Sequence, residues 1–186
     1  MLRDRDLIPG PRKKSTPRSI TLAVFLGIGT AIAARQIIHT FWFFPIGVET
    51  DHMAPAIKNG STVYINRLVK PARLKRGDIL LIRHPRSPDL YLIRRVIGKA
   101  GDRIEIKNGD VHLNDRALDA PWESALRKRY PRPSPIPAEI YPEANCPMVV
   151  VKPAHLYMLA DNRAQALDSR QLGQISVGLI IGKVWF

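Results

Sequence analysis

The sequence predicts a mainly β domain, a barrel or sandwich, attached to one N-terminal transmembrane helix. An apolar run without charge covers residues 19–34 and resumes as far as residue 44. From residue 45 onward, short runs rich in β-branched residues alternate with turn dipeptides, and no second long apolar helix follows. Short strand-length runs between turn signals are typical of all-β domains. A chain of 186 residues is long enough for one such domain and a short appendage.

The apolar run is the candidate membrane anchor. Sixteen residues at helical rise span roughly 24 Å, which is short of a hydrocarbon core of roughly 30 Å. Apolar and aromatic residues resume after Arg35 and Gln36, so a helix over 19–44 can span if Arg35 extends toward the headgroups. The competing hypothesis is a cleavable signal peptide, because residues 31–33 have the A-x-A form of a cleavage site. A third interpretation, a buried helix of a soluble protein, is disfavoured because no second long helix is apparent that could cover the apolar run.

The tail before the anchor, residues 1–18, is basic: six Lys or Arg residues stand against Asp4 and Asp6. By the positive-inside rule, such a tail stays in the cytoplasm and residues 45–186 lie outside. The sequence therefore predicts a single-pass protein of the bacterial cytoplasmic (inner) membrane, with the lipids of that membrane among its partners.

The strand candidates follow one another through the rest of the chain. A turn at Asn59-Gly60 precedes the first of them, and residues 103–113 form the best hairpin candidate, reversing near Asn108-Gly109. Residues 121–147 are rich in proline, so we expect a loop or partly ordered excursion there rather than a core element. The other predicted strands cover residues 61–66, 78–82, 91–97, 148–152, 156–159 and 177–186.

The excess of basic residues limits the classes of partner that this protein is expected to bind. Lys and Arg outnumber acidic residues 29 to 16, which favours an acidic partner such as lipid headgroups, an acidic protein surface or nucleic acid. The predicted export of the domain argues against nucleic acid, and no helix-turn-helix or stacking-aromatic signature is present. The single Cys146 cannot form an internal disulfide. We expect no metal and no cofactor, because Asp51-His52 with His84 fits no standard zinc spacing.

Four segments, in order, resemble the conserved boxes of the signal peptidase I family of membrane-anchored serine endopeptidases. Residues 44–57 (FPIGVETDHMAPAI) are similar to "EPFxIPSGSMxPTL", and residues 75–82 (KRGDILLI) to "xxGDIVVF". Residues 93–104 (IRRVIGKAGDRI) resemble "IKRVVGLPGDxI", and residues 159–170 (LADNRAQALDSR) resemble "xGDNRxxSxDSR". The resemblance runs from about residue 19 to the C-terminus and leaves only the proline-rich excursion without a counterpart.

This resemblance implies a Ser nucleophile and a Lys base, yet His52 and Arg94 stand at those two positions. A third position, where the family has the Ser that orients the Lys amine, holds Ala166. Guanidinium stays protonated and has no acceptor lone pair, so Arg94 cannot serve as the base. Imidazole can attack acyl groups, but amide cleavage also needs a proton for the leaving amine, which an adjacent fixed cation does not supply.

Other positions keep the pattern of the family. Thr50 stands where the family places a hydroxyl donor for the oxyanion, and Asp51, Met53 and Ala166 belong to the implied substrate groove. The resemblance also implies structural ion pairs among Arg95, Asp161, Asp168 and Arg170. These pairs hold a fold together whether or not it is catalytic.

Two functions follow from this pattern. The first is a signal-peptidase-like membrane protein without family-type hydrolysis, which binds exported peptides or pilins by strand pairing and hands them to a secretion or pilus assembly complex. The second is an active signal peptidase or conjugative pilin-maturation peptidase with an unconventional site, for which Lys58 or Lys99 could replace the missing base.

Overall fold

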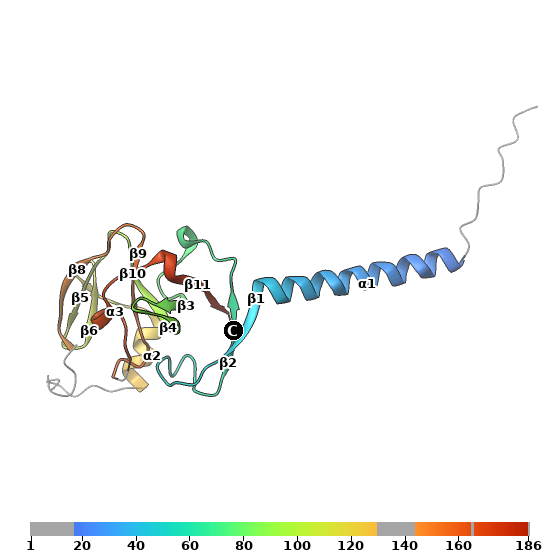
Figure 1. The fold of residues 1–186 in the computed structure, drawn as a ribbon. Helices are drawn as coiled ribbons and strands as arrows, with labels where there is room; N and C mark the ends of the chain where they lie inside the picture. The colour runs from blue at the N-terminus through green and yellow to red at the C-terminus, as the bar shows by residue number, and fades with distance from the viewer. Residues whose placement is uncertain (1–16, 130–143, 165, 186) are drawn as a thin grey trace, which may run out of the picture. The chain divides into compact units, whose positions relative to one another are not determined.

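The computed structural model describes residues 17–129, 144–164 and 166–185, in two units, Met1–Phe41 and Trp42–Phe186 (Figure 1). Helix α1 covers Pro17–Trp42, and its window Ile20–Ile37 is long and apolar enough to cross a membrane. Its large apolar side chains are exposed, Phe25 to 70%. The helix ends two residues before the predicted limit of the anchor, because Phe43 and Phe44 pair with Asn66 and Ile65 of the next strand.

The main sheet has seven antiparallel strands in the order β1-β2-β11-β3-β4-β9-β10. In this sheet the last strand of the chain, β11, lies between β2 and β3, which come much earlier in the sequence. The bounds are β1 Phe43–Gly47, β2 Thr62–Asn66, β3 Ile79–His84, β4 Ser87–Lys99, β9 His155–Leu159, β10 Ile175–Ser176 and β11 Ile180–Trp185.

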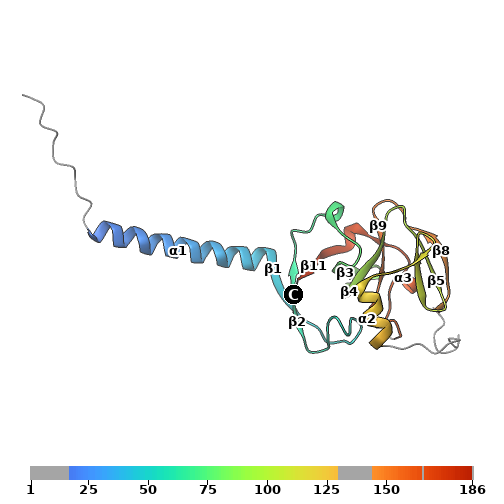
Figure 2. The same ribbon diagram turned by 180° about the vertical axis from the view of Figure 1, so that it is seen from behind.

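A second antiparallel sheet has four strands in the order β7-β6-β5-β8. Figures 1 and 2 show this sheet at one end of the β domain and strands β1 and β2 at the other. Its strands are β5 Arg103–Lys107, β6 Asp110–Leu113, β7 Arg116–Ala117 and β8 Cys146–Val150, and the short helices of the domain are η1 Pro71–Arg73, α2 Pro121–Arg129, α3 Ser169–Leu172 and η3 Val177–Leu179.

Strand β3 shows how the apolar runs become core. Its residues Ile79 and Leu81 pack into one hydrophobic cluster, while Leu80 and Ile82 pack into another. Successive side chains of a strand point to opposite faces, so a continuous apolar run buries both faces of a central strand. We call the cluster that contains Ile79 and Leu81 the first core cluster; it also holds Met53 and Ala166.

The structure corrects the prediction for the proline-rich excursion. Residues 121–129 form helix α2, and its Glu123 and Leu126 are buried. Pro121 opens this helix, where a missing N–H costs nothing, and Glu123 lies in the first turn, where a negative charge is favoured. Residues 130–143 lie outside the described part of the chain.

The last predicted strand, residues 177–186, is also divided. Residues 177–179 form η3, and regular pairing resumes in β11 with a register shift between Ile180 and Gly182. A Cβ at Gly182 would lie 2.6 Å from the carbonyl oxygen of Asn66, so glycine allows the two backbones to approach closely there.

Candidate functional site

The loop that carries His52 is held by its own hydrogen bonds and by two buried anchors. The Ala54 amide donates to the Asp51 carbonyl at 3.0 Å, and the Ile57 amide donates to the Met53 carbonyl at 2.8 Å. Met53 and Ile57 are both 2% exposed and belong to the first core cluster. His52 itself is half-buried, so the loop fixes its backbone while leaving part of its surface open.

His52 contacts the fourth box through its backbone. Its carbonyl accepts a hydrogen bond from the Asn162 amide at 2.9 Å. Ala166, four residues further on, packs in the same cluster as Met53. The structure therefore brings the first and fourth boxes together. Thr50 and Asp51, which the resemblance assigns to oxyanion and groove, are exposed.

Arg94 lies inside the domain, with only 2% of its surface exposed. Its Nε donates to the carbonyl of Leu167 at 2.9 Å, and its Nη1 donates to the carbonyl of Ile93 at 2.6 Å. Its Nη2 is buried and has no hydrogen-bond partner among the described residues. Arg94 thus contacts the fourth box through a backbone carbonyl, and neither of these two hydrogen bonds goes to a carboxylate.

Burial changes the acidity of this guanidinium. Desolvation lowers the pKa of Arg94 to about 10; the negative charge of Asp168 opposes this shift, and the positive charge of Arg170 adds to it. At neutral pH the group is still protonated. It can donate hydrogen bonds and supply positive charge, but it offers no lone pair to accept a proton.

Two ion pairs hold the ends of the loop that Arg94 and His52 contact. Arg95 forms a bidentate pair with Asp161, with Nε and Oδ1 2.7 Å apart, and Arg170 pairs with Asp168 at 2.9 Å. The Asp168 carboxylate also caps helix α3 and accepts from the Ala160 amide at 3.1 Å. Because these pairs are buried, they fix both ends of the loop to the β domain.

Helix α2 supplies two residues that the sequence did not indicate. Glu123, 1% exposed, forms a bidentate pair with Arg163 of the loop at 2.6 and 3.0 Å. The Trp122 ring lies over the Arg95 guanidinium at 5.5 Å and fills the space beside Gly77. The Pro121-x-Glu123 pattern is a helix start that could have been found, but nothing in the sequence points to its partners.

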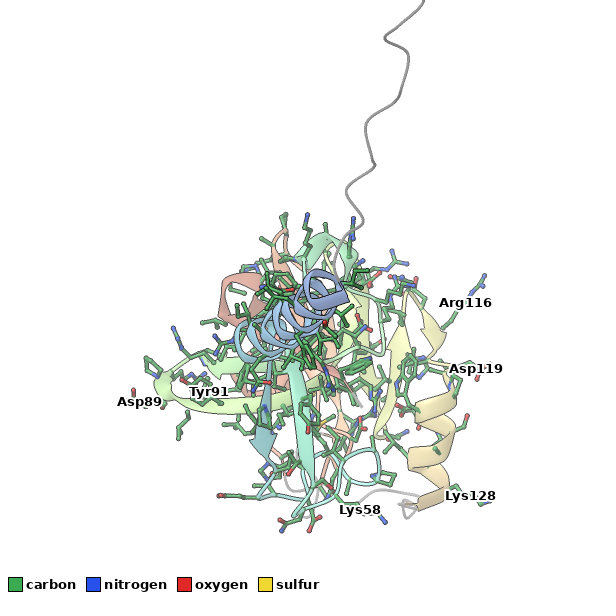
Figure 3. All side chains as sticks on the ribbon, turned by 90° about the vertical axis from the view of Figure 1, so that its right-hand side faces the viewer. Lys58, Asp89, Tyr91, Arg116, Asp119 and Lys128 are labelled. Carbon is green, nitrogen blue, oxygen red and sulfur yellow. The ribbon has the colours of Figure 1, made fainter. Side chains whose placement is uncertain are left out.

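The remaining candidates lie apart from this arrangement. No group of three or more His, Cys, Asp or Glu residues in the described part of the chain could hold a metal ion. His84, the last residue of β3, accepts a hydrogen bond at Nδ1 from the Arg86 amide. Lys58 is exposed in its turn, as Figure 3 shows, and Lys99 lies at the end of β4.

The family profile described as signal peptidase, peptidase S26, matches residues 20–186. Signal peptidase I S of Bacillus subtilis (strain 168) is 29% identical over 143 residues, which are 75% of this chain and 73% of that protein. Signal peptidase IB of Staphylococcus aureus (strain Mu50) is 29% identical over 165 residues, which are 87% and 85% of the two chains.

Among solved structures, a signal peptidase I from Enterococcus faecalis V583 aligns with a TM-score of 0.47 and 19% identity, over 60% of this chain and 96% of that one. The profile match covers nearly the whole chain, including all four boxes and the residues His52, Arg94 and Ala166. This chain therefore belongs to the signal peptidase family, peptidase S26.

Proposed function

We propose that this protein is a membrane-anchored relative of signal peptidases that binds exported peptides, pilins among them, without hydrolysing them by the Ser/Lys mechanism. The observation that carries the proposal is the environment of Arg94. A base in this mechanism must be neutral and must present a lone pair. With a pKa of about 10 and two nitrogens donating to backbone carbonyls, Arg94 meets neither condition at neutral pH.

The two other replacements support the same conclusion. Ala166 is 7% exposed and has no hydroxyl to orient a base. His52 has an imidazole that can accept a proton, but the chemistry also requires a group that returns a proton to the leaving amine. A guanidinium cannot cycle in this way. The site thus keeps the positive charge of Arg94 but, in this proposal, no pair of groups that can take up and return a proton.

Two strand edges support peptide binding. Among the described residues, β1 pairs only with β2, and β4 pairs with β9 only from Arg95 to Lys99. Residues 91–94 of β4 therefore have β3 on one side and no strand partner among the described residues on the other. Ile46 of β1 and Ile93 of β4 both pack against the first core cluster. An extended peptide pairs with such edges through main-chain hydrogen bonds.

Helix α1 and the family support the site of action. An apolar helix of this length suits a membrane anchor. With the basic tail in the cytoplasm, the β domain lies on the extracytoplasmic side of a bacterial cytoplasmic membrane, where signal-peptide-bearing substrates emerge. A secretion or pilus assembly complex is the natural recipient of a substrate that is held but not cut.

The test compares the parent chain with one variant, both full-length and purified in detergent, on a signal-peptide-bearing substrate. The variant His52→Ser/Arg94→Lys/Ala166→Ser restores the three family groups. We expect cleavage by the variant and none by the parent, while both bind a fluorescent segment of the substrate. A Lys58→Gln version of each protein controls for the loss of a surface cation near the site.

The alternative, an active peptidase with an unconventional nucleophile, predicts the opposite result. Turnover by the parent that is lost in His52→Ala would overturn the proposal, and an additional loss in Lys58→Gln would identify Lys58 as the substitute base. Absence of peptide binding by the parent would remove the recognition role and leave only the altered site.

A further inference from the structure

A basic loop, residues 67–75, connects β2 to β3 and stands apart from the candidate site. It contains Arg67, Lys70, Arg73 and Lys75 and no acidic residue, and all four cationic residues are exposed. None of the four has an ion pair among the described residues, whereas the neighbouring Arg76 is paired with Asp102 at 2.7 Å. The loop therefore presents four uncompensated positive charges.

The loop is anchored rather than loose. Leu74 is 1% exposed, and Val69 packs against the cluster that contains it. The amides of Arg73 and Leu74 donate to the carbonyls of Lys70 and Pro71, forming the short helix η1. Two apolar side chains thus point inward while the cations face solvent. Between them, Leu68 is 53% exposed.

Two contacts join the loop to the first residues of the β domain. The Arg67 amide donates to the carbonyl of Trp42, the last residue of α1, at 3.0 Å. The Arg67 guanidinium lies over the Phe44 ring at 4.3 Å from its centroid. In the β1–β2 hairpin, Phe43 pairs with Asn66 and Gly47 pairs with Thr62. The basic loop thus leaves the hairpin at the end where β1 follows Trp42 in the chain, and the His52 loop connects its other end.

We propose that residues 67–75 bind the anionic lipid headgroups of the membrane face at which α1 ends. The inference rests on one part of the proposed function, that α1 is a membrane anchor, and not on the chemistry of the site. The apolar window of α1 ends at Ile37, so Trp42 is only about 8 Å further along the helix axis. Arg67 is hydrogen-bonded to that residue and is consequently held near the depth of the headgroups.

Charge complementarity identifies the occupant. Basic residues held near an anionic bilayer each favour binding by about fivefold, and the effect falls off within a Debye length. Four such residues on one rigid loop, with Leu68 available to enter the interface, form a lipid-binding surface on a domain that is already tethered. Docking by this loop would fix the orientation of the domain toward the membrane.

The test uses the full-length chain in vesicles and an environment-sensitive fluorophore on Leu68→Cys in a Cys146→Ser background. In vesicles with about 30 mol% phosphatidylglycerol we expect a blue shift and at least about a twofold rise in emission relative to pure phosphatidylcholine. The change should reverse at about 0.5 M sodium chloride, where the Debye length is about 4 Å. The same label on Met148→Cys, which is 50% exposed on the second sheet, should not respond.

Charge variants identify the residues. Arg67→Gln/Lys70→Gln/Arg73→Gln/Lys75→Gln should lose the response, and Lys58→Gln/Arg116→Gln/Lys128→Gln/Lys152→Gln should keep it. Figure 3 shows Lys58, Arg116 and Lys128 on other parts of the domain surface. An equal response in neutral vesicles, an equal loss in the control variant, or a shift with inorganic phosphate alone would overturn lipid docking. If a fourfold variant misfolds, the salt dependence of the label response in the protein without these charge substitutions still tests lipid docking.

Flotation separates this proposal from the anchor. The chain should float with neutral vesicles through α1 alone. Failure to float would overturn both the anchor and the docking, while flotation without a label response would overturn only the docking.

Discussion

The Arg94 guanidinium donates from Nε to the carbonyl oxygen of Leu167 at 2.9 Å, one residue beyond Ala166. This bond places a buried cation against the segment in which the family has a hydroxyl that orients its base. In the proposed function, the replacement of the base is thus matched by the replacement of its orienting hydroxyl in the neighbouring segment. The two boxes still meet in space, but they meet through groups that cannot exchange a proton.

The first prediction concerns the pH dependence of the variant His52→Ser/Arg94→Lys/Ala166→Ser. The burial that lowers the pKa of Arg94 should also lower the pKa of a lysine there below its ordinary value of about 10.4. A lysine base acts when neutral, so activity should rise with pH through that lowered pKa. Initial rates from pH 6 to 9 measure it. His52→Ser/Ala166→Ser, which keeps Arg94, should stay inactive throughout; equal activity in this control would contradict the assignment.

The second prediction concerns the pair that joins α2 to the loop. The side chains of Glu123 and Arg163 are 2% and 11% exposed. Glu123→Gln leaves a buried cation without its charge partner, and breaking a buried pair in this way costs about 3–5 kcal/mol of unfolding free energy. Urea denaturation of the full-length protein in detergent measures this. Glu105→Gln, which removes an exposed pair with Lys107, should cost less than about 1 kcal/mol; similar losses would show that α2 is not a structural brace.

The third prediction separates backbone strain from packing at Gly77. Gly77 and Gly101 both have positive φ, 91° and 88°, but only Gly77 has a neighbour: a Cβ there would lie 2.6 Å from the Trp122 ring. Gly101→Ala should cost about 1–2 kcal/mol from strain alone. Gly77→Ala should cost about 1–3 kcal/mol more, because the ring must move. Thermal unfolding of both variants gives the difference, and adding Trp122→Leu should remove it; equal costs would exclude the packing contact.

The fourth prediction is the acid stability that Asp102 contributes. Desolvation alone would raise the pKa of this carboxyl, but hydrogen bonds from Arg76, the Lys99 amide and Asn114 outweigh it and lower the pKa. As the pH falls below about 4, Asp102 takes up a proton in the unfolded chain before it does so in the folded chain. The contribution of Asp102 to the free energy of unfolding is therefore present above that pH and is lost on acidification. Asp102→Asn should be less stable at pH 7 but should lose less between pH 4 and the acid limit. Urea midpoints at pH 7 and about pH 3 test it; an unchanged acid loss would count against Asp102.

The elements that could be predicted are those with a strong local pattern. The apolar run predicted α1 to within two residues at its C-terminal end, and alternating β-branched residues predicted the core strands. Helix α2 was missed because a proline-rich neighbourhood outweighed its start signal, Pro121 followed by Glu123. The pairing of β11 with β2 and β3 has no local signal, since strands this far apart in sequence meet only when the sheet closes over its core.

For the site, the order of the four boxes predicts that His52, Arg94 and Ala166 stand at the nucleophile, base and base-orienting positions, and this assignment stays a prediction. The sequence determined by itself that Arg94 is a donor and Ala166 an inert methyl, because these are properties of the residues. Only the tertiary structure decided that Arg94 is 2% exposed and bonded to Leu167, and that Glu123 braces Arg163. The physical reason is that burial, and with it the cost of a charge and the shift of its pKa, depends on chain segments that are distant in sequence and close in space.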